Sequence, residues 1–174
     1  MRRAKIILTI LAVSFISVIS LASAIDYNRP LDIGYSDLTK DAKRQVDCLA
    51  ENIYHEAGVE SKQGKKAVAL VTMNRTQDER FPSNICGVVK QKINKTCQFS
   101  WFCMPVKINK NTDAYKESME IALFVYANYE NIKDITNGAL YYHADYVRPN
   151  WKGLKKTTTI GRHIFYKENK VIDL

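Results

Sequence analysis

The sequence predicts a single α+β domain in which helices dominate and a small antiparallel sheet forms late in the chain. Three long segments before residue 130 repeat apolar side chains at helical spacing. After residue 137, short strand-like runs alternate with turns. A run of helices followed by a run of strands is typical of an α+β architecture.

The first 24 residues have the three-part pattern of a secretory signal peptide. The basic stretch "MRRAK" precedes an apolar run from Ile6 to Leu21, which ends at the small residues Ala22, Ser23 and Ala24. This run is short for a membrane span and contains several polar residues, which favours cleavage after Ala24 over an uncleaved anchor. We therefore expect export to the periplasm or the exterior, without stable membrane association after cleavage.

The charge of the chain narrows the classes of partner. The formal net charge is +8, of which three charges lie in "MRRAK" and would leave with the signal peptide. The remaining excess suits an anionic partner such as an envelope polymer, a membrane surface or nucleic acid. No dense Lys and Arg run is interleaved with aromatic residues, and an exported protein meets little nucleic acid, so we expect no nucleic-acid partner. The sequence reveals no oligomer interface, and we expect a monomer.

The first helix is predicted to begin after Thr39 and to end at Gly58. Residues 25–40 form a leader segment, of which 25–36 lack periodicity and indicate a strand or loop; the domain proper extends over 41–174. Thr39 can cap the helix, and Asp41 suits the positive end of its macrodipole. The apolar stripe of this helix comprises Ala42, Val46, Leu49, Ala50, Ile53 and Ala57.

Two further long helices are predicted, with shorter elements between them. Ser61 can cap "KQGKKAVALVTMNRT", whose nearly all-apolar centre indicates a central helix. A short helix is predicted from Ser83 through "NICGVVKQ", "KINKT" is predicted as a polar loop, and "CQFSWFC" as a buried loop or strand. Asn111 or Thr112 opens the third long helix, "DAYKESMEIALFVYANYE".

The predicted strands follow the turn at Asn137 and Gly138. The stretch "ALYYHA" is strand-like, and "TTTIGRHIFYKENKVIDL" predicts three strands separated by turns at Gly161 and Asn169.

Four cysteines, Cys48, Cys86, Cys97 and Cys103, lie in the part of the chain that would be exported. An even number in an oxidising compartment indicates two disulfides, for which three connectivities are possible. Structural zinc is disfavoured, because the spacings contain no CxxC and no histidine lies close enough to complete a usual finger.

Glu56 is an acidic residue on an apolar helix face. It follows Ile53 by three residues and Leu49 by seven, so it shares the face of the core residues. Burial there would raise the pKa of the carboxyl group, as a general acid requires near neutral pH. The alternative is a boundary glutamate that turns outward or pairs with a Lys or Arg.

Other chemistries find less support. "HEAGV" fails the zinc motif HExxH, because Val59 stands where the second histidine belongs. The three histidines, His55, His143 and His163, have no ligand spacing, so we expect no metal and no cofactor. "QFSWF" lacks the glycines of a nucleophile elbow, and a reduced catalytic cysteine is less expected than disulfides in an exported protein.

Several blocks together resemble one family. "CLAENIYHEAGVESKQGKKAVALVTMNRT", "RFPSNICGVVKQ", "CQFSWFC", "NGALYYHADYVRPNW" and "IGRHIFYK" are similar, in order and approximate spacing, to the SleB-like cell-wall hydrolases of the spore-cortex-lytic type. The resemblance covers about residues 46–167. It implies a fold related to lysozyme and the lytic transglycosylases, and cleavage of peptidoglycan glycan strands.

The resemblance also implies roles for individual residues. Glu56 occupies the position of the family's catalytic acid, and Asn74 and Arg75 match the pair that closes the second helix. The family commonly reads EARGE where this chain has "EAGVE", which changes the loop after Glu56. The implied substrate-binding residues are Gln98, Ser100, Trp101, Tyr142, His143 and Trp151; Tyr141 is a further ring for stacking on sugars, and core packing is the alternative for each aromatic residue.

The implied reaction is that of a lytic transglycosylase, in which one carboxylate serves first as acid and then as base. A hydrolase would need a second carboxylate, for which Glu60, Asp134 and Asp145 are the candidates. The alternatives are a zinc-dependent N-acetylmuramoyl-L-alanine amidase that depends on His143 and His163, and a non-catalytic wall-binding module.

The resemblance bears on the cysteines as well. A Cys97–Cys103 disulfide would hold "QFSWF" still and leave Cys48 to pair with Cys86. A connectivity that joins Cys86 to Cys97 remains open.

Overall fold

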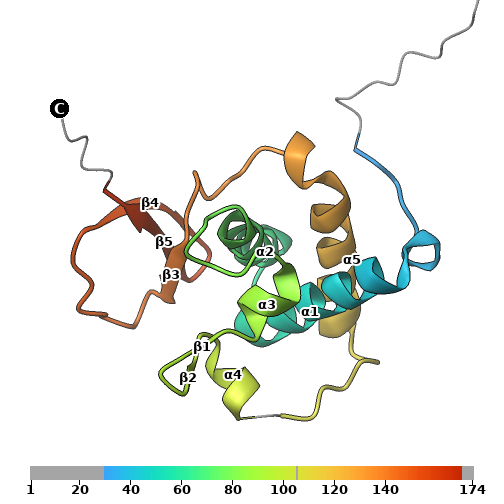
Figure 1. The fold of residues 1–174 in the computed structure, drawn as a ribbon, viewed down its shortest axis with the longest axis horizontal. Coiled ribbons are helices and arrows are strands. Elements are labelled where there is room, and N and C mark those ends of the chain that lie inside the picture. Colours follow the sequence, from blue (N-terminus) through green and yellow to red (C-terminus); the bar gives the residue numbers. More distant parts are fainter. Residues whose placement is uncertain (1–29, 105, 170–174) are drawn as a thin grey trace, which may run out of the picture.

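Three long helices form the body of the molecule, and a small sheet lies at one end of it (Figure 1). The computed structural model describes residues 30–104 and 106–169, so the proposed signal peptide and the strand predicted after Asn169 lie outside the described residues. The long helices are α1 (Lys40–Ala57), α2 (Lys62–Thr76) and α5 (Asp113–Asn128). Among the described residues no helix is long and apolar enough to cross a membrane.

Local capping places the helices where the sequence predicts them. The side chains of Thr39, Ser61 and Thr112 each accept a hydrogen bond from a backbone N–H in the first turn of α1, α2 and α5. The leader has no strand but contains a 3₁₀ turn, η1 (Tyr35–Asp37), and a second, η2 (Tyr129–Asn131), follows α5.

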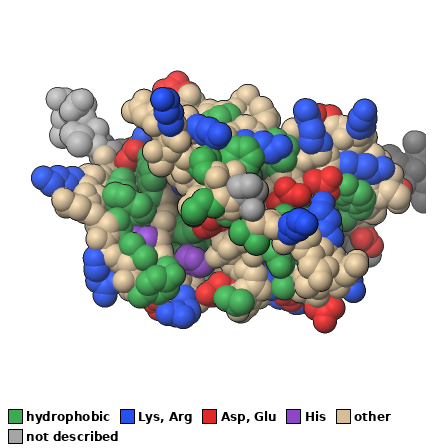
Figure 2. All heavy atoms as spheres, turned by 90° about the horizontal axis from the view of Figure 1, so that it is seen from below, with side chains coloured by type: hydrophobic (Ala, Val, Ile, Leu, Met, Phe, Trp, Pro, Cys, Tyr) green, Lys and Arg blue, Asp and Glu red, His purple; other side chains and the backbone are tan. Residues whose placement is uncertain are grey.

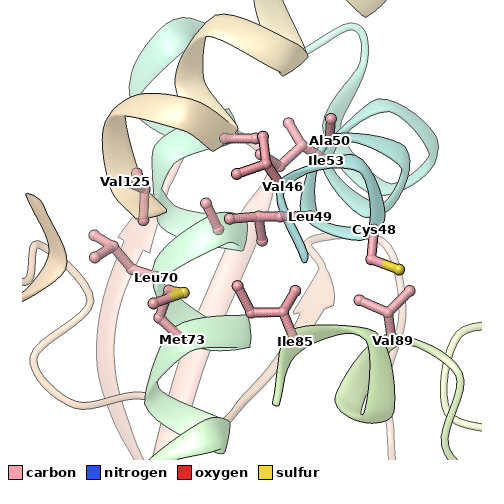
Figure 3. Packing of buried hydrophobic residues seen from close by; sticks show 12 residues of the cluster. Val46, Cys48, Leu49, Ala50, Ile53, Leu70, Met73, Ile85, Val89 and Val125 are labelled. Carbon is pink, nitrogen blue, oxygen red and sulfur yellow. The ribbon is translucent and has the colours of Figure 1, made fainter. Parts of the chain in front are cut away.

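The main core lies where α1, α2 and α5 meet the short helix α3 (Ile85–Val89). Figure 3 shows side chains from these helices converging around Leu49 of α1, which is fully buried. On its other side α2 contacts the sheet, because Ala67 and Val71 pack against Phe165. The prediction that α2 is central is therefore confirmed, because this helix lies between the helical core and the sheet.

The sheet contains β3 (Tyr141–Ala144), β4 (Leu154–Ile160) and β5 (His163–Glu168) in the order β3-β5-β4, all antiparallel. Tyr142 on the edge strand β3 pairs with Phe165 on β5. Because side chains alternate along a strand, Tyr142 and Phe165 lie on the face toward α2, whereas Tyr141 and His143 lie on the opposite face.

Three local predictions were wrong. "KINKT" is not a plain loop but a hairpin of β1 (Lys92–Ile93) and β2 (Thr96–Cys97), closed by Asn94 and Lys95, which both have positive φ as a type I′ turn requires. "CQFSWFC" contains a one-turn helix, α4 (Ser100–Cys103), whose residues are not buried. The short helix α3 begins at Ile85, after its cap Asn84, and not at Ser83.

Two disulfides brace these short elements. Cys48–Cys86 joins α1 to α3, and Cys97–Cys103 joins the end of β2 to α4. The connectivity with Cys86 joined to Cys97 is not the one formed. The second bridge closes a short loop around Gln98 and Ser100, which restricts how far this segment can move.

Candidate active site

Glu56 lies in the last turn of α1 and lines a cavity of about 220 Å³ between the helices and the sheet. The other walls come from α2, from the segment closed by Cys97–Cys103, and from β3. The side chain is half-buried, and burial raises the pKa of its carboxyl group above the usual value. Glu56 thus turns into a cavity, and its neutral form persists to a higher pH than that of an ordinary glutamate, in the direction that the helix stripe predicts.

Tyr142 is the direct hydrogen-bond partner of Glu56. Its hydroxyl donates to Oε2 of Glu56 at 3.1 Å. The ring is held edge-on to His163, with centroids 5.2 Å apart, and packs against Phe165. Burial raises the pKa of Tyr142 well above its usual value, so the hydroxyl keeps its proton and remains a donor. This bond stabilises the carboxylate form of Glu56 and opposes the effect of burial on its pKa.

Arg75, in the last turn of α2, is the second group that acts on Glu56. Only 3% of Arg75 is exposed, its Nε donates to the carbonyl of Leu140 at 2.8 Å, and its guanidinium lies over the rings of Phe81 and Phe99. Its positive charge lowers the pKa of Glu56, and burial lowers the pKa of Arg75 itself. Arg75 follows the apolar centre of α2, but the sequence by itself does not indicate that its side chain is buried.

Asn74 connects α2 to the loop that leads into β3. Its side-chain amide donates to Asp134 and to the carbonyl of Ala139, each at 3.0 Å, and its carbonyl accepts from the Tyr129 hydroxyl at 2.8 Å. Together with the bond from Arg75 to Leu140, these contacts determine where β3 begins. Asn74 and Arg75 therefore determine the position of Tyr142 next to Glu56.

Gln98 and Ser100 line the same cavity as Glu56 and Tyr142. Gln98 also lines an adjoining cavity of about 740 Å³, which is bounded by Tyr141 and Trp151 on the outer face of the sheet. Trp151 is 44% exposed, so its ring is available to a ligand. Figure 2 shows hydrophobic side chains gathered toward the sheet on this side of the molecule, while Lys and Arg side chains are spread over the face.

Two predicted site residues lie elsewhere. Trp101 stacks on His55 with ring centroids 4.4 Å apart and donates to Oδ1 of Asn52 at 3.3 Å. His143 lies on the outer face of β3, where its ring stacks on Tyr166 and its Nε2 is 3.0 Å from the Tyr166 hydroxyl. Neither residue lines the cavity of Glu56, because α4 and β3 each turn them away from it.

The candidates for a second carboxylate are engaged elsewhere. Glu60 accepts from the backbone N–H of Arg162 at 3.3 Å, and Asp145 pairs with the Arg162 guanidinium. Asp134 accepts hydrogen bonds from Thr136 and the loop around it. Among the described residues, Glu56 is the only acidic residue that lines its cavity. No cluster of three or more His, Cys, Asp or Glu suited to a metal ion occurs in the described part of the chain.

Comparisons with known proteins agree with this architecture. The family model for cell wall hydrolases matches residues 59–166, which include every residue of the cavity except Glu56. The spore cortex-lytic enzyme of Halalkalibacterium halodurans is 28% identical over 134 residues, which are 76% of this chain but 36% of that protein. The chain thus spans about a third of the length of this curated relative.

Two solved structures share the fold. The catalytic domain of the germination-specific lytic transglycosylase SleB from Bacillus anthracis has a TM-score of 0.57 and 26% identity, over 72% of this chain and 95% of that domain. The catalytic domain of Bacillus cereus SleB has a TM-score of 0.53 and 25% identity, over 80% of this chain and 96% of that domain. These matches confirm the predicted α+β, lysozyme-like class. This chain belongs to the cell wall hydrolase family.

Proposed function

We propose that this protein cleaves peptidoglycan glycan strands between N-acetylmuramic acid and N-acetylglucosamine, as a lytic transglycosylase with Glu56 as the catalytic residue. The observation that carries this proposal is a single carboxylate with a raised pKa, held by Tyr142 in a cavity that no other acidic residue of the described chain lines. The family membership and the SleB catalytic domains support the class of reaction.

The reaction needs one proton that Glu56 gives and takes back. Neutral Glu56 donates its proton to the glycosidic oxygen, and the electrons of the breaking bond leave with the N-acetylglucosamine side. The C6 hydroxyl of the muramic acid then attacks C1, and the Glu56 carboxylate accepts the hydroxyl proton. A 1,6-anhydro ring forms without water, and Glu56 ends the cycle protonated.

The surroundings of Glu56 suit both steps. Burial favours the neutral acid that must exist before bond cleavage, whereas Tyr142 and Arg75 stabilise the carboxylate that exists afterwards. Because these effects oppose each other, the two protonation states are brought closer in free energy. A group that serves as acid and then as base needs this balance.

The remaining contacts would position the sugar chain. Gln98 and Ser100 lie where they can hydrogen-bond sugar hydroxyl or acetamido groups beside Glu56, and Tyr141 and Trp151 offer aromatic faces in the adjoining cavity. We place the protein outside the cytoplasm, where its N-terminal sequence would direct it, and propose that it acts as a monomer.

The test is mass spectrometry of soluble fragments released from purified peptidoglycan by the protein from residue 25 onward. Fragments that end in 1,6-anhydromuramic acid should appear with the unmodified protein, fall by at least roughly 10²-fold with Glu56→Gln, and persist with a chelator. Glu60→Gln is the matched control, because this nearby glutamate does not line the cavity.

Other products would point elsewhere. Reducing muramic acid ends would mean hydrolysis and a second carboxylate. Free peptides that vanish with a chelator would mean a zinc amidase. Retained binding to peptidoglycan without any released fragment would mean a wall-binding module.

A further inference from the structure

A further cavity, of about 660 Å³, lies at the C-terminal end of α2, and Glu56 is not among its lining residues. Asn74 and Gln77 contribute to its wall from the end of α2, Lys155 from β4 and Lys167 from β5. Charged side chains of both signs line this cavity, among them Asp78, Arg80 and Glu168. The reaction proposed above leaves it without a role.

Lys155 and Lys167 are direct cross-strand partners in this cavity. They lie on the same face of neighbouring strands, where like charges directly opposite each other are destabilising. Neither amino group forms an ion pair with a carboxylate among the described residues. The Lys167 amino group donates to the backbone carbonyl of Asn137 at 3.2 Å, which holds it in place without neutralising it.

The two acidic side chains of the same cavity both pair with one arginine, not with the lysines. Arg80 forms an ion pair with Asp78 at 2.6 Å and a second one with Glu168. Glu168 also accepts a hydrogen bond from the Tyr141 hydroxyl at 2.8 Å. The charged side chains that line this cavity therefore carry a formal net charge of +1, and the excess lies on the two lysines, which an anion of suitable size could bridge.

The cavity adjoins the candidate active site. Leu140 lines the cavity of Lys155 and Lys167, called here the lysine cavity. The next residue, Tyr141, lines the cavity of Trp151, called the aromatic cavity, and Tyr142 lines the cavity of Glu56. At about 3.3 Å per residue of strand, roughly 7 Å separate Leu140 from Tyr142. Glu168 also lines both the lysine cavity and the aromatic cavity, so these two cavities adjoin.

We propose that the lysine cavity binds the stem peptide of peptidoglycan, with Lys155 and Lys167 holding one of its carboxylates. This inference rests on the proposed function, because the stem peptide is attached to the muramic acid that the Glu56 cavity would hold. An extended peptide of three to four residues reaches roughly 10 to 14 Å, enough to pass from one cavity to the other. The peptide carries free carboxylates along its length, whereas a strand without peptides carries only the lactyl carboxylate attached to each muramic acid ring.

The test compares intact peptidoglycan with glycan strands from which an amidase has removed the peptides. The double variant Lys155→Gln/Lys167→Gln should lose roughly fivefold to tenfold in kcat/KM on the intact substrate and keep its rate on the peptide-free strands. Lys156→Gln is the matched control, because this lysine neighbours Lys155 but lies on the opposite face of β4.

The outcomes separate the two proposals. An unmodified protein that cleaves both substrates equally well, or a double variant that loses the same factor on both, overturns the peptide site. A double variant with a lower Tm and equal losses would mean that the lysines only complement the negative end of α2.

A direct titration with the isolated stem peptide, followed by NMR, tests binding without catalysis. Shifts at the amides of Lys155 and Lys167 that disappear in the double variant support the site even if no fragments are ever released. The absence of shifts at millimolar peptide overturns it. Failure to cleave either substrate counts against the proposed function alone.

Discussion

Tyr142→Phe offers the sharpest test of how Glu56 is tuned. The substitution removes only the hydroxyl that donates to Glu56 Oε2 and keeps the ring that packs against His163 and Phe165. A hydrogen bond to a charged group contributes roughly 1.5 to 3 kcal/mol. We take the lower value, because 3.1 Å is longer than the strongest bonds of a hydroxyl to a carboxylate.

The sign of the effect follows from which form of Glu56 is stabilised. The Tyr142 hydroxyl donates to the carboxylate and lowers the pKa of Glu56, so its loss raises that pKa further. A general acid is active while protonated, and activity is lost as pH rises through its pKa. Loss of about 1.5 kcal/mol should therefore move the high-pH limb of kcat/KM upward by about one pH unit, while the maximal rate falls about tenfold.

The assay is the pH profile of anhydro-ended fragment release, measured beside Tyr141→Phe. The Tyr141 hydroxyl donates to Glu168 on the outer face of β3, so its removal should leave the limb in place. A limb that stays still or moves to lower pH in Tyr142→Phe would refute the reasoning. An equal shift of the high-pH limb in both variants would mean that a general change in the sheet causes the shift, and not the loss of the bond to Glu56.

The other predictions concern stability and cofactor dependence. Replacing Cys48 and Cys86 with serine should lower the free energy of unfolding by about 4 kcal/mol, and replacing Cys97 and Cys103 by about 2 kcal/mol, because the first bridge closes the longer loop. Urea denaturation measures both losses, and the reverse order would contradict this prediction. Loss of the shorter bridge should nevertheless slow fragment release more, since it frees the segment that lines the cavity. Asn74→Ala should cost about 2 to 3 kcal/mol, because several partners lose their hydrogen bonds; a midpoint unchanged in urea would contradict this. Prolonged dialysis against a chelator should leave both activity and Tm unchanged. Activity that is lost on dialysis and restored by added zinc would count against a glycosidase.

Local signals in the sequence were sufficient for the three long helices. Thr39, Ser61 and Thr112 each satisfy a free backbone N–H at a helix start, which depends only on residues within one turn. The spacing of Glu56 from Leu49 likewise places its carboxylate toward the core from helix geometry alone. The hairpin at "KINKT" was missed because Lys95 occupies a turn position where glycine is the usual signal.

The candidate site needed contacts that sequence patterns do not contain. Alternation along β3 implies that Tyr142 and His143 face opposite sides, but not which of them meets α2. Trp101 belongs to a block that resembles the family, yet the turn of α4 directs it onto His55. Such orientations depend on burial and long-range packing, and neither produces a periodic pattern in the sequence.

The sequence by itself determined the α+β class, the positions of the three long helices, the core-facing carboxylate and the expectation of disulfides, because each depends on residues close together in the chain. Only the tertiary structure decided that the Tyr142 hydroxyl, 86 positions away, meets Glu56, and that Arg75 lies near enough to act on its pKa. It also decided that Lys155 and Lys167 share one cavity. The physical reason is that strand pairing and helix packing bring distant residues together, and their mutual distances fix the pKa values and the charge on which the chemistry depends.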